Sequence, residues 1–159
     1  MQILRIVLVA TVATIQTTGG YRTGPVLVAA AASGHAIVIP GTGRVSLLGI
    51  RSPAAGRGAA ADPVGVEARE RLNGLVAHHF VILEYPRAVR TPQFGSPRVA
   101  DGSVLRGAAY VFLEDGTFVN RLLVREGLAR VSGARSAPRA AELQEAEAAA
   151  RAEKRGLWR

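Results

Sequence analysis

The sequence predicts an α+β fold in which five short strands and three helices form one domain that closes as a small barrel. Apolar, β-rich stretches are separated by Gly- and Pro-containing turns, and stretches with helical periodicity and caps lie between them. The chain has 159 residues, of which 48% are hydrophobic, so it can bury one core. It contains no cysteine, which excludes disulfides, thiolate catalysis and Cys-ligated zinc.

Three strands are expected first along the domain, because β-rich runs alternate with turn residues there. We place them at residues 25–32, 35–39 and 44–50. Ser33-Gly34 and the Gly-rich stretch 40–43 supply the turns between them.

A helix over residues 64–77 follows a loop rich in Gly, Ala and Pro. Asp62 is in the position of an N-cap and Pro63 occupies the first helical position. Residues 80–85 are expected to form the fourth strand. Residues 86–103 contain three prolines and no periodicity, which predicts a long exposed loop.

The remaining elements are a fifth strand and two helices. The strand is predicted over residues 105–113, and a short helix over 118–126, with Leu122 and Leu123 inward and Gly127 ending it. An extended piece over residues 128–132 precedes the last helix, which we expect over 138–155. Ser136 is the expected cap of this helix, Gly156 its stop, and Leu157-Trp158 are expected to fold back on the body.

The N-terminal residues 1–22 are predicted to be a signal peptide or a membrane anchor helix. Arg5 precedes an apolar run over residues 6–15, which is typical of a secretory segment and shorter than most membrane spans. This places the domain, residues 24–159, outside the cytoplasm, as an exported, periplasmic or membrane-anchored unit. A buried strand of a soluble domain is the alternative, because Val, Ile and Thr favour strands.

Four segments in order along the chain carry a family resemblance. They are LLGIRSP (residues 47–53), GVEARERL (65–72), AAYVFLEDGTFVNRLLVREGLARV (108–131) and EAEAAARAEKRGLW (145–158). Together they resemble the staphylococcal nuclease (thermonuclease) family over about residues 25–159. The resemblance implies an OB-fold barrel of five strands with three helices.

The residues at the family's functional positions differ from the family pattern. The resemblance implies Asp-Gly-Asp-Thr after the first strand, where this chain has Ser33-Gly34-His35-Ala36. It further implies an arginine where Ser46 stands, a calcium-binding aspartate where Arg51 stands, and a glutamate that positions or deprotonates water where Ala54 stands. Arg106 matches a phosphate-binding arginine, although the Tyr-Gly before it is lost.

These replacements predict a domain without the family's nuclease activity. Calcium prefers six or more oxygen ligands, carboxylates prominent among them, and the guanidinium of Arg51 repels the ion. Ala54 can neither orient an attacking water nor accept its proton. We therefore expect no catalytic residue, no metal and no cofactor.

The exchanged residues leave an arginine-rich cleft that predicts a metal-free anion site. Its candidate residues are Arg44, Arg51, Arg106 and His35, which a phosphate or an acidic side chain would contact. The alternative is a decayed site whose arginines are solvated or pair with Glu84 and Asp101. His78 and His79 point apart at a helix end, so we expect them to be structural and not metal ligands.

The net charge and the predicted loop over residues 86–103 indicate what kind of partner the protein binds. The formal net charge is +8, and Lys154 is the only lysine. This loop is an insertion relative to the family pattern, and its candidates for docking a partner protein are Arg87, Arg90, Phe94 and Arg98. Phe94 is the one aromatic there that could stack on a base, which disfavours a nucleic-acid surface.

Three functions remain open from the sequence. The favoured one is a catalytically inactive binding or structural accessory protein, tethered to a membrane and docked on a protein complex. The first alternative is a non-catalytic binder of nucleic acid or another anion, and the second is a metal-dependent nuclease.

Overall fold

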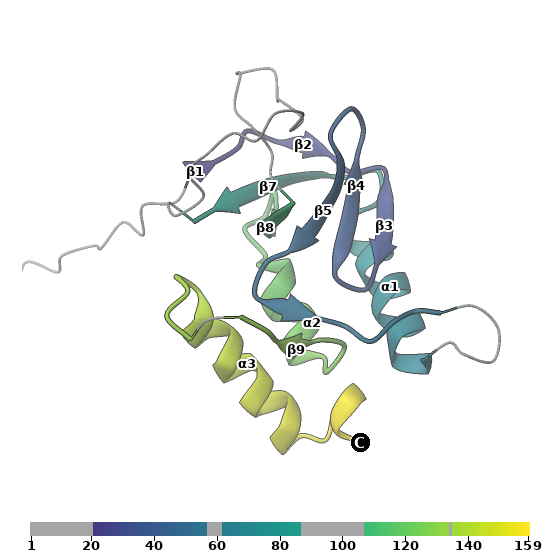
Figure 1. Ribbon diagram of the computed structural model, residues 1–159, viewed down its shortest axis with the longest axis vertical. Helices are drawn as coiled ribbons and strands as arrows, with labels where there is room; N and C mark the ends of the chain where they lie inside the picture. The colour runs from purple at the N-terminus through teal and green to yellow at the C-terminus, as the bar shows by residue number, and fades with distance from the viewer. Residues whose placement is uncertain (1–20, 57–61, 87–106, 134) are drawn as a thin grey trace, which may run out of the picture.

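The computed structural model describes residues 21–56, 62–86, 107–133 and 135–159 (Figure 1). Three α-helices are present in these ranges: α1 (Pro63–Val76), α2 (Val119–Arg125) and α3 (Ala140–Ala152). The strands are β1 (Tyr21–Arg22), β2 (Val26–Leu27), β3 (Ala30–Ser33), β4 (Ala36–Ile39), β5 (Gly43–Leu47), β6 (Ile50–Arg51), β7 (Phe80–Tyr85), β8 (Ala108–Leu113) and β9 (Arg130–Val131). A 3₁₀ turn, Gly156–Trp158, ends the chain.

The main sheet is mixed and runs in the order β1-β7-β8-β5-β4-β3, with β2 also paired to β7. The β5–β8 pair is parallel and its other pairs are antiparallel. Because β2 pairs with β7 while β3 pairs with β4, the stretch from Val26 to Ser33 joins the two ends of the sheet. The five-stranded barrel is thereby closed, and the predicted α+β fold with three helices is confirmed.

The first predicted strand, residues 25–32, is wrong as a single element. It is divided between two neighbours, with Val28 at the crossing point: its N–H donates to the His79 carbonyl (3.0 Å) and its carbonyl accepts from the His78 N–H (2.8 Å). One residue later, the Ala29 N–H donates to the Val38 carbonyl of β4 (2.8 Å). Local composition could not show this change of partner, because it depends on pairing with the distant strands β7 and β4.

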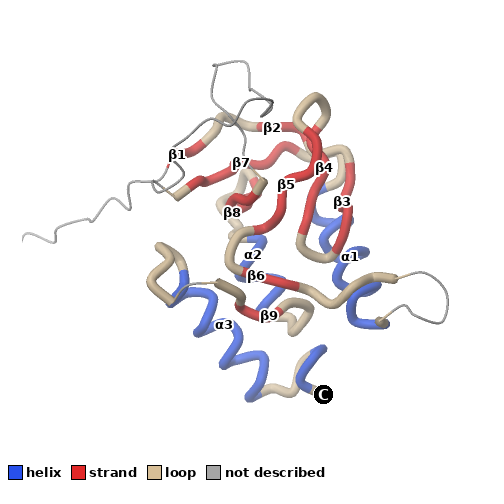
Figure 2. The backbone as a smooth tube through the Cα atoms, viewed as in Figure 1, coloured by secondary structure: helices blue, strands red, loops and turns tan. Residues whose placement is uncertain are grey.

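The third predicted strand, residues 44–50, also ends early. β5 stops at Leu47, and Gly49 takes a φ of 78°, which turns the chain away from the barrel. Ile50–Arg51 then forms β6, which pairs with β9 in a separate two-stranded sheet, as the tube drawing shows (Figure 2). The extended piece predicted at residues 128–132 is this β9.

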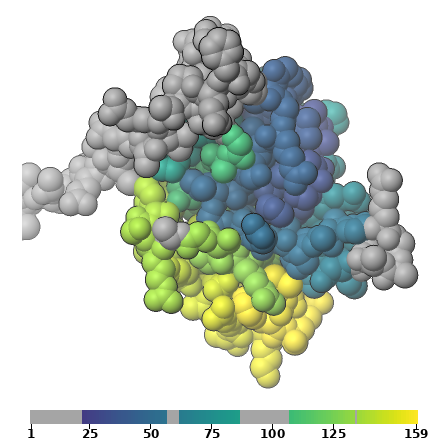
Figure 3. Space-filling model, in the orientation of Figure 1, coloured from purple at the N-terminus to yellow at the C-terminus, as the bar shows by residue number. Residues whose placement is uncertain are grey.

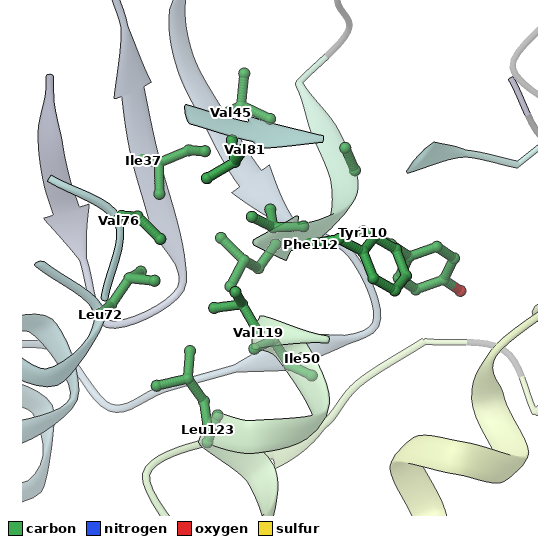
Figure 4. Close-up of a cluster of buried hydrophobic side chains, with 14 of the residues drawn as sticks. Ile37, Val45, Ile50, Leu72, Val76, Val81, Tyr110, Phe112, Val119 and Leu123 are labelled. Carbon is green, nitrogen blue, oxygen red and sulfur yellow. The ribbon is translucent and has the colours of Figure 1, made fainter. Parts of the chain in front are cut away.

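Helix α1 is confirmed with its cap. The Asp62 Oδ1 accepts from the backbone N–H of Val64 (2.8 Å) and of Gly65 (3.2 Å), and Pro63 opens the helix. Its buried stripe includes Leu72 and Val76, which lie beside the barrel residues Ile37, Val45 and Val81 (Figure 4).

Helix α3 begins later than predicted, and the expected Ser136 cap is wrong. The N-cap is Arg139, which makes no side-chain capping bond. Its guanidinium donates instead to Glu84 (2.7 and 2.9 Å) and to Glu142 (2.8 Å). The helix ends at Ala152, before the expected Arg155, because Lys154 adopts a φ of 50°. A contact with the distant strand β7 therefore fixes the start of this helix.

The C-terminal turn folds back as predicted. The Leu157 N–H donates to the carbonyl of Gly127 (2.9 Å), and Gly127 has the positive φ, 75°, expected at the end of α2. In the space-filling view the light green and yellow C-terminal residues pack against one another beneath the barrel (Figure 3).

The barrel has a second apolar layer on the outside of β8. Alternate residues of a strand point to opposite faces, so Ala109 and Val111 face one side and Tyr110 and Phe112 the other. Figure 4 shows Tyr110 pointing away from Leu72 and Val76. The ring of Phe118 stacks on Phe112, with centroids 4.8 Å apart.

Two predictions, on the N-terminal segment and on the long loop, fall largely outside the described residues. Residues 1–20 of the predicted leader or anchor lie outside them, whereas Tyr21 and Arg22 form β1 against Tyr85 and Glu84 of β7. Of the predicted loop 86–103, only Pro86 is described. Within the described ranges, no helix has the length and apolarity needed to cross a membrane.

Candidate functional site

The turn between β3 and β4 places the first candidate residues against α1 and the segment after β6. Gly34 is buried in this turn, where a Cβ would lie 2.5 Å from the Ala68 Cβ and 2.6 Å from the Ser52 Oγ. Only glycine allows this approach. The close packing fixes the positions of Ser33 and His35 on either side of it.

His35 is held by Ser52 in a defined tautomer. The Ser52 N–H points at the His35 Nδ1 (3.3 Å), and the Ser52 hydroxyl lies 2.9 Å from the same nitrogen. A backbone N–H can only donate, so the proton of the neutral ring is on Nε2. Partial burial lowers the pKa of His35, and the nearby charges of Arg44 and Arg51 lower it further. The ring is therefore neutral at pH 7 and offers one donor.

Arg44 and Arg51 are both exposed, and neither forms an ion pair within the described residues. Arg44 donates to the Ser33 hydroxyl through Nη2 (3.3 Å). The alternative prediction, that the arginines of this cleft pair with Glu84, is wrong, because Glu84 forms its ion pairs with Arg22 and Arg139. The other proposed partner, Asp101, lies outside the described residues.

Arg51 stands opposite another arginine. In the β6–β9 ladder Arg51 pairs with Arg130, and directly opposed residues of an antiparallel pair project from the same face. Like charges in this position repel each other unless a counter-charge lies between them. The Arg130 guanidinium lies 5.0 Å from the Trp158 ring centroid. Sequence reasoning missed Arg130, since the β6–β9 register decides its position.

The other candidate residues are less closely grouped. Ser46 is half-buried in β5, opposite Ala36 of β4 and Ala108 of β8, and Ala54 is exposed beyond β6. Arg106 lies outside the described residues. So do the candidates for partner docking: Arg87, Arg90, Phe94 and Arg98.

The side chains here do not fit the calcium ion that the resemblance implies for active family members. The described candidate positions offer two hydroxyls, one neutral imidazole and two guanidiniums, and no carboxylate. Within the part of the chain that is described, no three His, Cys, Asp or Glu side chains are grouped so that they could hold a metal ion. The chemistry available is hydrogen-bond donation to an anion.

Comparison with known proteins agrees with the barrel topology. The family model described as staphylococcal nuclease homologue matches residues 44–159, more than half of the chain. The chain belongs to the staphylococcal nuclease homologue family. The matched range includes Ser46, Arg51 and Ala54, whereas the Ser33–Ala36 turn precedes it. No match was found among curated proteins.

Proposed function

We propose that this member of the staphylococcal nuclease homologue family is a catalytically inactive binding or accessory protein. The observation that carries the proposal is Arg51, which stands in β6 where the family resemblance implies a calcium-binding aspartate. Arg51 and Arg44 lower the pKa of His35, so the local field is positive and opposes a divalent cation. Ala54 supplies no group that could activate water.

A nuclease assay tests this proposal. We expect no metal-dependent cleavage of single-stranded DNA in Ca²⁺, Mg²⁺ or Mn²⁺, and no rise in melting temperature on adding Ca²⁺, because a bound ion would stabilise the folded state. An active family nuclease serves as positive control. Metal-dependent cleavage that co-purifies with the folded chain would contradict the proposal, and a mock purification from cells that lack the chain identifies cleavage by a contaminant.

We further propose that the domain is exported or membrane-tethered and docks on a protein complex. The apolar run over residues 6–15 supports this part of the proposal. The full chain is expected in the exported or membrane fraction of cells, with a partner recovered by cross-linking. A variant lacking residues 1–20 should be found in the cytoplasm. Equal cytoplasmic distribution of both forms would rule the tether out.

The unpaired arginines favour a second candidate function, the binding of an anion. Arg44, Arg51 and Arg130 have no acidic partner among the described residues, and two of them oppose each other across a ladder. A phosphate between them would relieve this repulsion and accept paired hydrogen bonds.

NMR titration of the histidine rings tests for the anion. Bound phosphate would add negative charge near His35, so its lowered pKa should rise when phosphate is added at low salt. The rise should be absent in Arg51→Ala and preserved in Arg69→Ala, a substitution on α1. An unchanged His35 titration in phosphate would exclude the site.

A further inference from the structure

A pocket of about 790 Å³ lies outside the barrel, bordered by β7, β8, α2 and the start of α3. It shares no residue with the candidate anion site. The residues that line it include Arg22, Phe112, Phe118, Arg121, Leu122 and Arg139. Its volume is in the range of sites that take a ligand or a few side chains.

The floor of the pocket is aromatic. The rings of Phe112 and Phe118 stack with centroids 4.8 Å apart and planes at 14°, and Tyr110 meets Phe118 edge-on. Leu122 extends the apolar surface: it is half-buried and lines the pocket, whereas Leu123 is fully buried in the core. The prediction that both leucines point inward is therefore wrong for Leu122. An aromatic or branched aliphatic side chain suits this floor.

Two arginines are fixed above the floor by one buried carboxylate. Glu84, 6% exposed, accepts from Arg22 Nε (2.7 Å) and from Arg139 Nε (2.7 Å). Both guanidinium carbons lie 4.8 Å from the Phe112 ring centroid. Burial opposes ionisation of Glu84, but the hydrogen bonds and charges of the two arginines outweigh it and lower its pKa. The terminal nitrogens of Arg22 have no hydrogen-bond partner within the described residues.

The α2 side of the pocket adds unused donors. Arg121 is exposed and has no ion pair among the described residues. Arg125, one turn later, donates to Glu153 through Nη2, and its Nη1 is buried and so is not available to a ligand. Two glutamates also line the pocket. Glu142 forms an ion pair with Arg139. Glu114 lies in the turn before α2, where its charge would repel a ligand carboxylate. Free donors beside an apolar floor select a ligand that has a carboxylate next to an apolar side chain.

We infer that this pocket is the docking site for an acidic segment of a partner protein, one apolar side chain of which packs on the half-buried Phe118 and Leu122. The flanking Asp or Glu carboxylates accept hydrogen bonds from Arg121 and Arg22. The inference rests on the proposed docking function and specifies the chemistry of the partner. Planar guanidinium groups suit paired contacts with carboxylates.

Fluorescence anisotropy with a labelled peptide, Gly-Asp-Asp-Phe-Asp-Asp-Gly, tests the inference on the full chain. We expect saturable binding that weakens about tenfold in Arg121→Glu and in Leu122→Gln. Arg69→Glu is the matched control, since Arg69 is also exposed and unpaired within the described residues but lines no part of this pocket. It should change the affinity less than about twofold. Peptides with Phe replaced by Ser, or Asp by Lys, should bind much more weakly.

Several outcomes would overturn the inference. The first is the absence of binding at about 1 mM peptide. The second is an equal loss of peptide affinity in Arg121→Glu and Arg69→Glu, and the third is equal affinity for the Phe-containing and the Ser-substituted peptides. A short oligothymidylate that competes for the pocket with equal affinity would also overturn it and would point to nucleic acid. Leu122 is half-buried, so the melting temperature of each variant is measured to show that it is folded. If Leu122→Gln is unfolded, the result for Arg121→Glu decides the test.

This readout is independent of the nuclease test. Metal-dependent cleavage with intact peptide binding would reject the inactive-domain proposal alone. Absence of peptide binding without cleavage would reject the docking inference alone.

Discussion

Replacing Asn120 with alanine is expected to lower the free energy of unfolding by about 3–5 kcal/mol. Asn120 is fully buried; its Oδ1 accepts from the Val111 N–H (2.9 Å) and its Nδ2 donates to the Leu48 carbonyl (2.8 Å). It thereby ties α2 to β8 and to the end of β5. Alanine leaves both backbone groups without a partner. The buried Val111 N–H alone costs about 1–3 kcal/mol, and the partly buried Leu48 carbonyl and the lost packing of the side chain add the rest.

Chemical denaturation measures this loss, and Asn73→Ala is the control. Asn73 is exposed on α1 and its Oδ1 accepts one bond, from the Ala31 N–H (2.9 Å). Water can replace that bond, so the control should lose less than about 1 kcal/mol. Similar losses in the two variants would show that the Asn120 bonds do not join the helix to the barrel as described.

Gly127→Ala is the second large effect, with an expected loss of about 3 kcal/mol or more in the free energy of unfolding. A Cβ at Gly127 would lie 2.3 Å from the Arg155 carbonyl oxygen, and the φ of 75° adds about 1–2 kcal/mol of strain for a non-glycine residue. The backbone of the C-terminal turn must then move away. Because Trp158 lies in this turn, its fluorescence should shift to the red as it becomes solvated.

Gly116→Ala separates the two causes. Gly116 has a φ of 86°, but nothing lies within 4 Å of the position where its Cβ would be. This variant therefore carries the backbone strain without the clash, and its Trp158 fluorescence should be unchanged. If Gly127→Ala costs no more than Gly116→Ala in denaturation experiments, the close approach of the two segments is not important for stability.

The sequence predicted the elements whose signals are local. Asp62 and Pro63 mark the start of α1, and Gly127 the end of α2, because capping depends on residues within one turn of the helix. The sequence order of strands and helices was sufficient to predict the α+β barrel. Through the resemblance to the nuclease family it also predicted that Arg44, Arg51 and His35 border one site, and both arginines lie near enough to His35 for their charges to lower its pKa.

Other features depend on pairings between distant parts of the chain. The stretch 26–33 changes partner at Val28, and Arg139 starts α3 where Glu84 of β7 holds it. The opposition of Arg51 and Arg130 requires the β6–β9 register, and the aromatic pocket requires that Arg22, Phe112 and α2 meet outside the barrel.

The sequence by itself thus determined the order of the main elements, the start of α1, the end of α2 and the loss of carboxylates at the family's positions. These follow from residue type and short-range spacing, which a single sequence displays. Only the tertiary structure decided which arginines pair with a glutamate and which have no acidic partner within the described residues. Ion pairing depends on distances between side chains far apart in the chain, and strand register and barrel closure set those distances.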